Sequence, residues 1–148
     1  TNTMHKVAPQ IQEKITIPIL HIAQATAQAL LADGIQKVGL LGTKYTMTQD
    51  FYKEKLIESG LEVLIPDQAG ITEVNRIIYD ELCLGDINES SKQTYLAVID
   101  DLKKAGAEAV ILGCTEIGLL VKQSDTDLPL YDTTVIHAEK AAEWAVNK

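Results

Sequence analysis

The sequence predicts an α/β protein in which a parallel β-sheet is flanked by helices on both faces. Short, continuously apolar segments alternate with longer amphipathic segments along almost the whole chain. Such alternation is typical of βαβ units, whose strands run parallel. The apolar segments lack a polar face, as parallel strands buried on both sides do. With 148 residues, the chain is long enough for one complete domain plus part of a second.

The first predicted elements are a strand and a helix. Ile15–Ile22 is an apolar run that predicts a buried strand, with Pro18 tolerated near its beginning. Ala23–Asp33 is rich in Ala, Leu and Gln and predicts a helix, which Gly34 ends.

A second strand is predicted over Lys37–Gly42, and a helix over Thr46–Ser59 follows it. Thr46 and Gln49 match the spacing of a capping box at the start of this helix.

A third strand is predicted over Leu61–Ile65, where Pro66 closes it. Ile71–Leu84 has apolar residues at the spacing of one helix face, so it predicts an amphipathic helix. Ser90–Ala105 predicts a further helix, with Gly106 as its stop signal.

The last third of the chain repeats the pattern. Glu108–Leu112 is continuously apolar after its first residue and predicts a fourth strand. Leu128–Tyr131 predicts a fifth strand, and Thr134–Val146 predicts a closing helix.

The composition limits the kinds of molecule that the protein could bind. The formal net charge is −8, which argues against nucleic acid or an anionic membrane, since both require a basic surface. No apolar run reaches the length of a membrane span, and no signal-peptide pattern is present. Two cysteines do not form a disulfide framework. We therefore expect a cytoplasmic protein.

Small hydroxyl-bearing residues follow several of the predicted strands. Thr43, Thr115 and Thr133 each come within three residues of a strand end, and Asn2-Thr3 opens the chain. Ligands of open parallel sheets bind at the carboxyl ends of the strands. Each threonine could be a plain helix cap, but together they indicate a site for a small carboxylic acid.

Cys114 is the most informative single residue, because it lies between a buried strand and a helix predicted to begin near Glu116. A helix start favours the thiolate form, whereas the alternative is a buried structural cysteine. Cys83 is predicted to lie in a helix body as a packed or idle thiol.

The three histidines, His5, His21 and His137, stand alone in the sequence and are expected to be structural. They show no metal-ligand spacing, and no glycine-rich phosphate loop is present. We therefore expect neither a metal nor a nucleotide.

Several motifs, taken in order, resemble one family. They are Thr1–Lys6, Ile17–Ile22, Gly39–Met47, Gly113–Glu116 and Asp132–Ala138. The ordered set resembles the aspartate/glutamate racemase family, whose members racemise amino acids without a cofactor.

The resemblance implies roles for five residues. Cys114 would be one of two catalytic thiols, and Asn2, Thr3, Thr43 and Thr115 would bind the substrate. The substrate would be a small amino acid, and we also expect a homo-oligomer.

The resemblance also implies two pseudo-symmetric domains that face each other across the site, each supplying one cysteine. Residues 1–34 would be a remnant of the first domain, residues 35–132 would form the second, and residues 133–148 would pack as a helix on the first. The first cysteine, expected just before Thr1, and the family's N-terminal region are absent from this sequence. We therefore expect the chain to be inactive by itself.

Two alternatives stay open from the sequence. One is a decarboxylase or isomerase of the same superfamily that uses a single thiol. The other is a non-catalytic domain that binds carboxylic acids. Leu84 stands where relatives often have a basic residue, and Lys44 could replace it, so the preferred amino acid is not fixed.

Overall fold

A computed structural model describes residues 1–147. Its centre is a four-stranded parallel sheet in the order β2-β1-β3-β4. The strands are β1 (Lys37–Leu41), β2 (Glu62–Leu64), β3 (Ala109–Leu112) and β4 (Leu130–Asp132). β1 and β3 lie in the middle and are almost entirely buried, which explains their apolar sequences. The predicted parallel α/β fold is confirmed.

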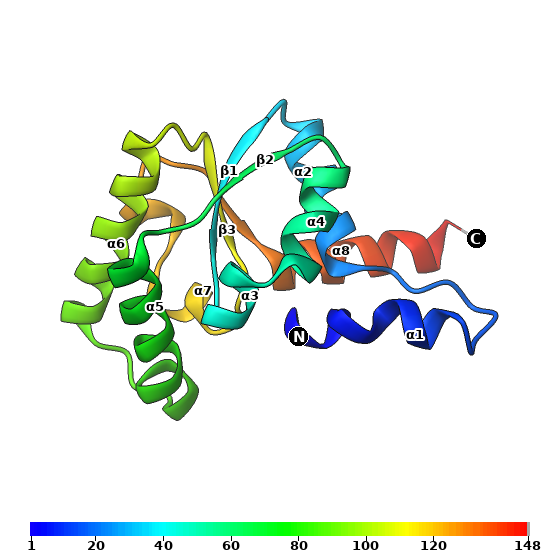
Figure 1. Ribbon diagram of the computed structural model, residues 1–148, viewed down its shortest axis with the longest axis horizontal. Coiled ribbons are helices and arrows are strands. Elements are labelled where there is room, and N and C mark those ends of the chain that lie inside the picture. The colour runs from blue at the N-terminus through cyan, green and yellow to red at the C-terminus, as the bar shows by residue number, and fades with distance from the viewer. Residues whose placement is uncertain (148) are drawn as a thin grey trace.

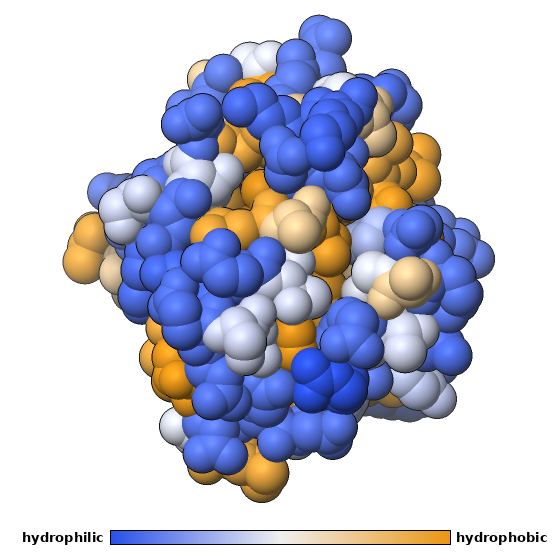
Figure 2. All heavy atoms as spheres, turned by 90° about the vertical axis from the view of Figure 1, so that its left-hand side faces the viewer, coloured by the Kyte–Doolittle hydropathy of each residue, from blue (hydrophilic) through white to orange (hydrophobic). Residues whose placement is uncertain are grey.

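Helices cover both faces of this sheet (Figure 1). On one face lie α5 (Gln68–Asp80) and α6 (Glu89–Lys104), and on the other lie α2 (Ile22–Ala32) and α4 (Asp50–Glu58). Each layer has its own apolar cluster against the sheet. The outward side of α5 and α6 is mainly hydrophilic, with small apolar areas between hydrophilic residues (Figure 2). These helices are therefore amphipathic, as the spacing predicts.

The C-terminal helix α8 (Thr133–Val146) packs beside α2. The remaining helical elements are short: η1 (Thr3–Val7), α1 (Ala8–Gln12), α3 (Lys44–Thr48), η2 (Leu82–Leu84), α7 (Ile117–Leu120) and η3 (Gln123–Asp125). Within residues 1–147, no helix combines the length and apolar character needed to cross a membrane.

The predicted strand over Ile15–Ile22 is wrong. The segment before α2 belongs to no sheet, and Ile17 is 70% exposed. Its backbone is instead bound by one side chain: the Gln12 amide donates to the Ile17 carbonyl (3.0 Å), and its oxygen accepts from the Ile19 N–H (2.8 Å). An apolar run forms a strand only where a neighbouring strand offers hydrogen-bond partners, and none lies here.

Two predicted helices differ from the observed ones. The helix over Thr46–Ser59 is divided at Gln49, whose extended backbone separates α3 from α4. Its cap is Thr43, whose hydroxyl accepts from the Thr46 N–H, so the capping box proposed for Thr46 is also wrong. The helix over Ile71–Leu84 stops at Asp80 and is followed by the separate 3₁₀ turn η2.

The division into domains at residues 34 and 132 stays a prediction. α2 packs against the sheet within the same cluster as β1 and α4. η1 packs against α4, and α1 extends from it to one side of the sheet (Figure 1). The predicted C-terminal segment ends at residue 148, which lies outside the described residues.

A glycine between the two central strands tests this packing. A β-carbon on Gly113 would lie 2.6 Å from the Leu41 carbonyl oxygen, and neither backbone can move without disturbing the sheet. We expect Gly113→Ala to lower the free energy of unfolding by about 1 to 3 kcal/mol, the usual cost of overpacking, in urea denaturation.

Gly42→Ala is the matched control, because its methyl would meet the Thr46 side chain at 3.1 Å and backbone, the Gly113 carbonyl oxygen, only at 3.3 Å. Its cost should be clearly smaller. Equal costs for both variants would contradict the claim that the strand ends are held in close backbone contact.

Candidate functional site

A cavity of about 180 Å³ lies at the carboxyl edge of the sheet. It is lined by the segments that follow β1 and β3, by the first residues of the chain and by the end of the α5–η2 region. The lining residues are Thr1, Asn2, Thr3, Thr43, Ile78, Tyr79, Cys83, Gly113, Cys114, Thr115 and Glu116. All five residues singled out from the sequence, Cys114, Asn2, Thr3, Thr43 and Thr115, therefore meet at one cavity, while their roles stay predictions.

Close backbone contact brings the two central turns together. The Gly113 N–H donates to the Leu41 carbonyl oxygen at 2.6 Å, which joins the carboxyl ends of β1 and β3. This contact places Thr43, two residues after β1, beside Cys114, two residues after β3. Thr43 is 9% exposed and caps α3, so it serves as a helix cap and as cavity wall together.

Asn2 is anchored by a chain of hydrogen bonds. Its side-chain amide donates to the Thr133 hydroxyl (3.1 Å), and that hydroxyl donates to the Leu112 carbonyl (3.0 Å). Asn2 is 5% exposed, and its side-chain oxygen is buried without a hydrogen-bond partner in the described structure. A buried acceptor without a partner is costly, so a donor on a bound ligand would stabilise it.

The Cys114 thiol is paired with a carboxylate. Its sulfur donates to Glu116 Oε2 at 2.9 Å. Burial, this hydrogen bond and the negative charge of Glu116 together raise the pKa of the Cys114 thiol to about 12. The expectation that a helix start favours the thiolate is wrong, because α7 begins only at Ile117 and has four residues. A helix this short adds little dipole beside the carboxylate.

Glu116 and Cys83 are cavity residues that the sequence did not reveal as such. Glu116 is only two residues from Cys114, and that spacing was the one available signal. Cys83 was placed in a helix body, but it lies exposed in η2 and lines the same cavity as Cys114. Partial burial and the charge of Glu116 raise the pKa of the Cys83 thiol.

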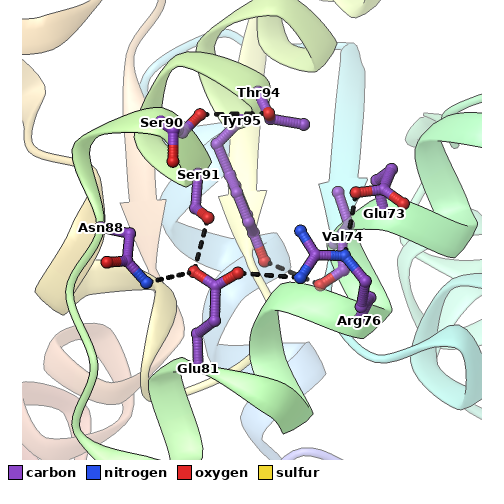
Figure 3. A network of polar contacts seen from close by, with 9 residues as sticks. All are labelled: Glu73, Val74, Arg76, Glu81, Asn88, Ser90, Ser91, Thr94 and Tyr95. Carbon is purple, nitrogen blue, oxygen red and sulfur yellow. Dashed lines mark hydrogen bonds and ion pairs between the residues drawn. The ribbon is translucent and has the colours of Figure 1, made fainter.

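A polar network fixes the turn that carries Cys83 (Figure 3). The Glu81 carboxylate accepts hydrogen bonds from Ser91 Oγ (2.5 Å), Asn88 Nδ2 (2.9 Å) and Arg76 Nη1 (2.8 Å). These bonds lower the pKa of the Glu81 carboxyl to about 2. The network ties the end of α5 to the start of α6, with η2 held between them.

The three histidines, which are isolated from one another in the sequence, lie together in the structure. The His5 ring lies 4.6 Å from the His21 ring and 5.6 Å from the His137 ring, between centroids. The cluster joins η1 to the starts of α2 and α8. His21 caps α2 by accepting from the Ala23 N–H, and His137 contacts the Leu20 carbonyl at 2.8 Å.

The two positions considered for a basic group do not line the cavity. Lys44 is exposed and is not among the lining residues, and Leu84 is 71% exposed. Among residues 1–147, no group of three or more His, Cys, Asp or Glu is arranged to hold a metal ion.

The structure thus defines an α/β protein with a thiol-containing cavity at the carboxyl edge of a parallel sheet. Residues 1–141 match the family model described as Asp/Glu/Hydantoin racemase, and the chain belongs to this family. The resemblance drawn from the sequence motifs is confirmed.

Solved structures agree with the family match. The crystal structure of a putative Asp/Glu racemase from Yersinia pestis is 52% identical to this chain, with a TM-score of 0.95. An aspartate racemase homologue from Pyrococcus horikoshii is 40% identical, with a TM-score of 0.90. Both comparisons cover 99% of this chain and 64% of the solved chain, so the chain spans just under two thirds of these relatives.

A third relative is similar in length. It is described as an uncharacterized protein in the pnlA 3′ region of Pectobacterium carotovorum subsp. carotovorum. It is 31% identical over 136 residues, which cover 90% of this chain and 89% of the relative.

The histidine cluster predicts acid sensitivity. Burial, then the charges of His5, Lys55 and His137, lower the pKa of His21 to about 4. A histidine with a lowered pKa contributes stability that is present above pH 6.5 and lost as the pH falls towards about 4. From pH 7 to pH 5, we expect this single group to lower the free energy of unfolding by about 1 kcal/mol, allowing for solvent screening.

His21→Asn keeps a side-chain acceptor for the cap and removes the titrating ring. Urea denaturation at pH 7 and pH 5 should show a smaller loss of stability in this variant than in the unaltered chain. The same loss in both would show that His21 is not the acid-sensitive group.

Proposed function

We propose that this chain carries one half of the proton-transfer site of a cofactor-independent amino-acid racemase, with Cys114 as the acid/base residue. The observation that carries the proposal is the shared cavity, in which Cys114 lies with Asn2, Thr3, Thr43 and Thr115. The family match favours this function over a single-thiol decarboxylase or a non-catalytic binding domain.

Racemisation removes the α-proton from one face of the substrate and returns a proton to the other. Two acid/base groups are therefore needed on opposite sides of the planar carbanion. Cys114 supplies one of them, and a second thiol would face it. Hydroxyl and N–H donors that bind the substrate carboxylate stabilise the negative charge of the carbanion, a task that needs no cofactor.

The cavity suits a small amino acid. Thr43 and Thr115 supply hydroxyl groups for the carboxylate, and the unpaired Asn2 oxygen is an acceptor for the substrate ammonium. Glu116 is the acidic side chain of the lining. Its charge disfavours a second carboxylate on the substrate, so we propose a preference for amino acids without an acidic side chain.

We also propose that η1, α1 and α8 belong to a second, pseudo-symmetric domain and that the chain assembles with itself. Apolar side chains on these segments are exposed: Met4 by 65%, Ile11 by 47%, Val135 by 51% and Val146 by 78%. Apolar side chains gathered on neighbouring segments are typical of a surface that is covered in the assembled protein.

Solvent exchange tests the assignment of Cys114. The chain is incubated in D₂O with each enantiomer of a panel of small amino acids, without pyridoxal phosphate or metal. We expect Cys114 to exchange the α-proton of one enantiomer with retention, seen by NMR, while chiral chromatography shows no racemisation by this chain alone. Since one positioned acid/base group contributes roughly 10²- to 10⁴-fold, Cys114→Ser should abolish the exchange.

Ser124→Ala, an exposed substitution in η3, is the control and should exchange as the unaltered chain does. If exchange survives Cys114→Ser and disappears in Cys83→Ser, then Cys83 is the thiol that exchanges the α-proton. That result would contradict the assignment of Cys114. Robust racemisation by the chain alone would contradict the need for a second thiol on another domain.

A further inference from the structure

The Glu116 carboxylate is directed at Cys114 and does not cap the helix that follows it. It occupies the N-cap position of α7, yet its side chain makes no capping hydrogen bond. Within residues 1–147 it also makes no ion pair with Lys, Arg or His. It accepts a hydrogen bond from the Cys114 thiol, at 2.9 Å from Sγ to Oε2, and one from the neighbouring Thr115 side chain. A plain structural role therefore does not account for this side chain.

The pair has a defined protonation pattern. Hydrogen bonds, first from Cys114 and then from Thr115, contribute to a lowered pKa of the Glu116 carboxyl, so Glu116 is a carboxylate and the thiol carries the proton. A thiolate at this distance would place two negative charges in contact, in a half-buried position where water screens them weakly.

We propose that Glu116 is the positioning residue for proton transfer at Cys114: its carboxylate orients the S–H bond and holds Cys114 as the neutral thiol until substrate is bound. This inference rests on the proposed function. It assigns Cys114 the role of proton donor in the resting site. In the complete site the base that acts first lies on the opposite face, whereas the α-proton exchange proposed for this chain alone proceeds through the minor thiolate fraction of Cys114.

The proton balance is simple. A base on the opposite face removes the α-proton and leaves a carbanion. The carbanion then takes the proton of Cys114: a C–H bond forms, the S–H bond breaks, and its electron pair stays on sulfur as the thiolate. Glu116 remains a carboxylate throughout, and no oxidant or reductant is required.

The reverse direction shows what the carboxylate contributes. The α-proton of an amino acid is a far weaker acid than a thiol, so a more basic thiolate removes it more readily. By disfavouring the thiolate, Glu116 makes it a stronger base whenever it forms. In the resting site the Cys114 thiol is a proton donor. In the reverse reaction the Cys114 thiolate is a stronger base than an ordinary thiolate.

Alkylation of Cys114 as a function of pH tests the inference directly, because only the thiolate reacts. The rate of iodoacetamide labelling is followed for each cysteine by peptide mass spectrometry, in the unaltered chain, Glu116→Gln and Glu54→Gln. Glu54 is an exposed residue of α4 and is the matched control. For Cys114 in the unaltered chain, we expect the pH at which the labelling rate is half-maximal to lie well above that of an ordinary thiol. This pH is the midpoint of the labelling profile.

Glu116→Gln should lower that midpoint and speed labelling of Cys114 at pH 8 by at least about fivefold, since a larger thiolate fraction outweighs its lower nucleophilicity. The midpoint of Cys83 should fall less, and Glu54→Gln should change neither. Circular dichroism checks that each variant is folded. If Glu116→Gln is not, Glu116→Asp replaces it, and its shorter side chain should give an intermediate midpoint.

An unchanged Cys114 midpoint in a folded Glu116 variant would overturn the inference, as would an ordinary midpoint in the unaltered chain. Neither result depends on a substrate. The proposed racemase chemistry is tested separately by α-proton exchange, so the two can fail independently.

Discussion

The hydrogen bond between Gly113 and Leu41 is the contact on which the site depends. The Gly113 nitrogen lies 2.6 Å from the Leu41 carbonyl oxygen, so the carboxyl ends of the two central strands are in direct contact. Only a residue without a β-carbon fits at this position. Because β1 and β3 end side by side, the turns that follow them face one cavity. The sheet itself brings Thr43 and Cys114 together. The two cavity turns that carry them directly follow the most buried strands.

A second set of contacts brings the first residues of the chain to the same edge. Asn2 is bound to Thr133, and Thr133 to the end of β3. The ring contacts of His5 with His21 and His137 hold η1 against α2 and α8. The position of Asn2 in the cavity wall therefore depends on packing around the histidines, although no histidine lines the cavity.

Much of the fold was predictable because the buried strands have few ways to satisfy their backbones. Four of the five strands and the helices between them were expected in the correct order. The segment over Ile15–Ile22 failed because an apolar run does not reveal whether a neighbouring strand exists. Cys83 was misplaced because the end of α5 is set by the contacts of Glu81 with Ser91 and Asn88, which come from beyond the helix.

The site was predictable to the extent that it follows strand ends. The five residues expected there do share a cavity, since the carboxyl ends of parallel strands lie on one edge. The histidine cluster was missed because its members are far apart in the chain. The thiol–carboxylate pair was missed because a contact across two residues depends on backbone geometry. That contact reverses the electrostatic expectation for Cys114, from a thiolate favoured by a helix to a thiol held by Glu116.

The most direct test of the central claim, that this cavity binds the carboxylate and ammonium groups of an amino acid, is a titration followed by ¹H–¹⁵N NMR. Small amino acids should shift the side-chain amide of Asn2 and the backbone amides of Thr43 and Thr115, and the matching amino-acid amides, which lack the carboxylate, should not. Shifts confined to another surface, such as the groove between Pro66 and Leu102 beside α5 and α6, or equal shifts with the amides, would contradict the account.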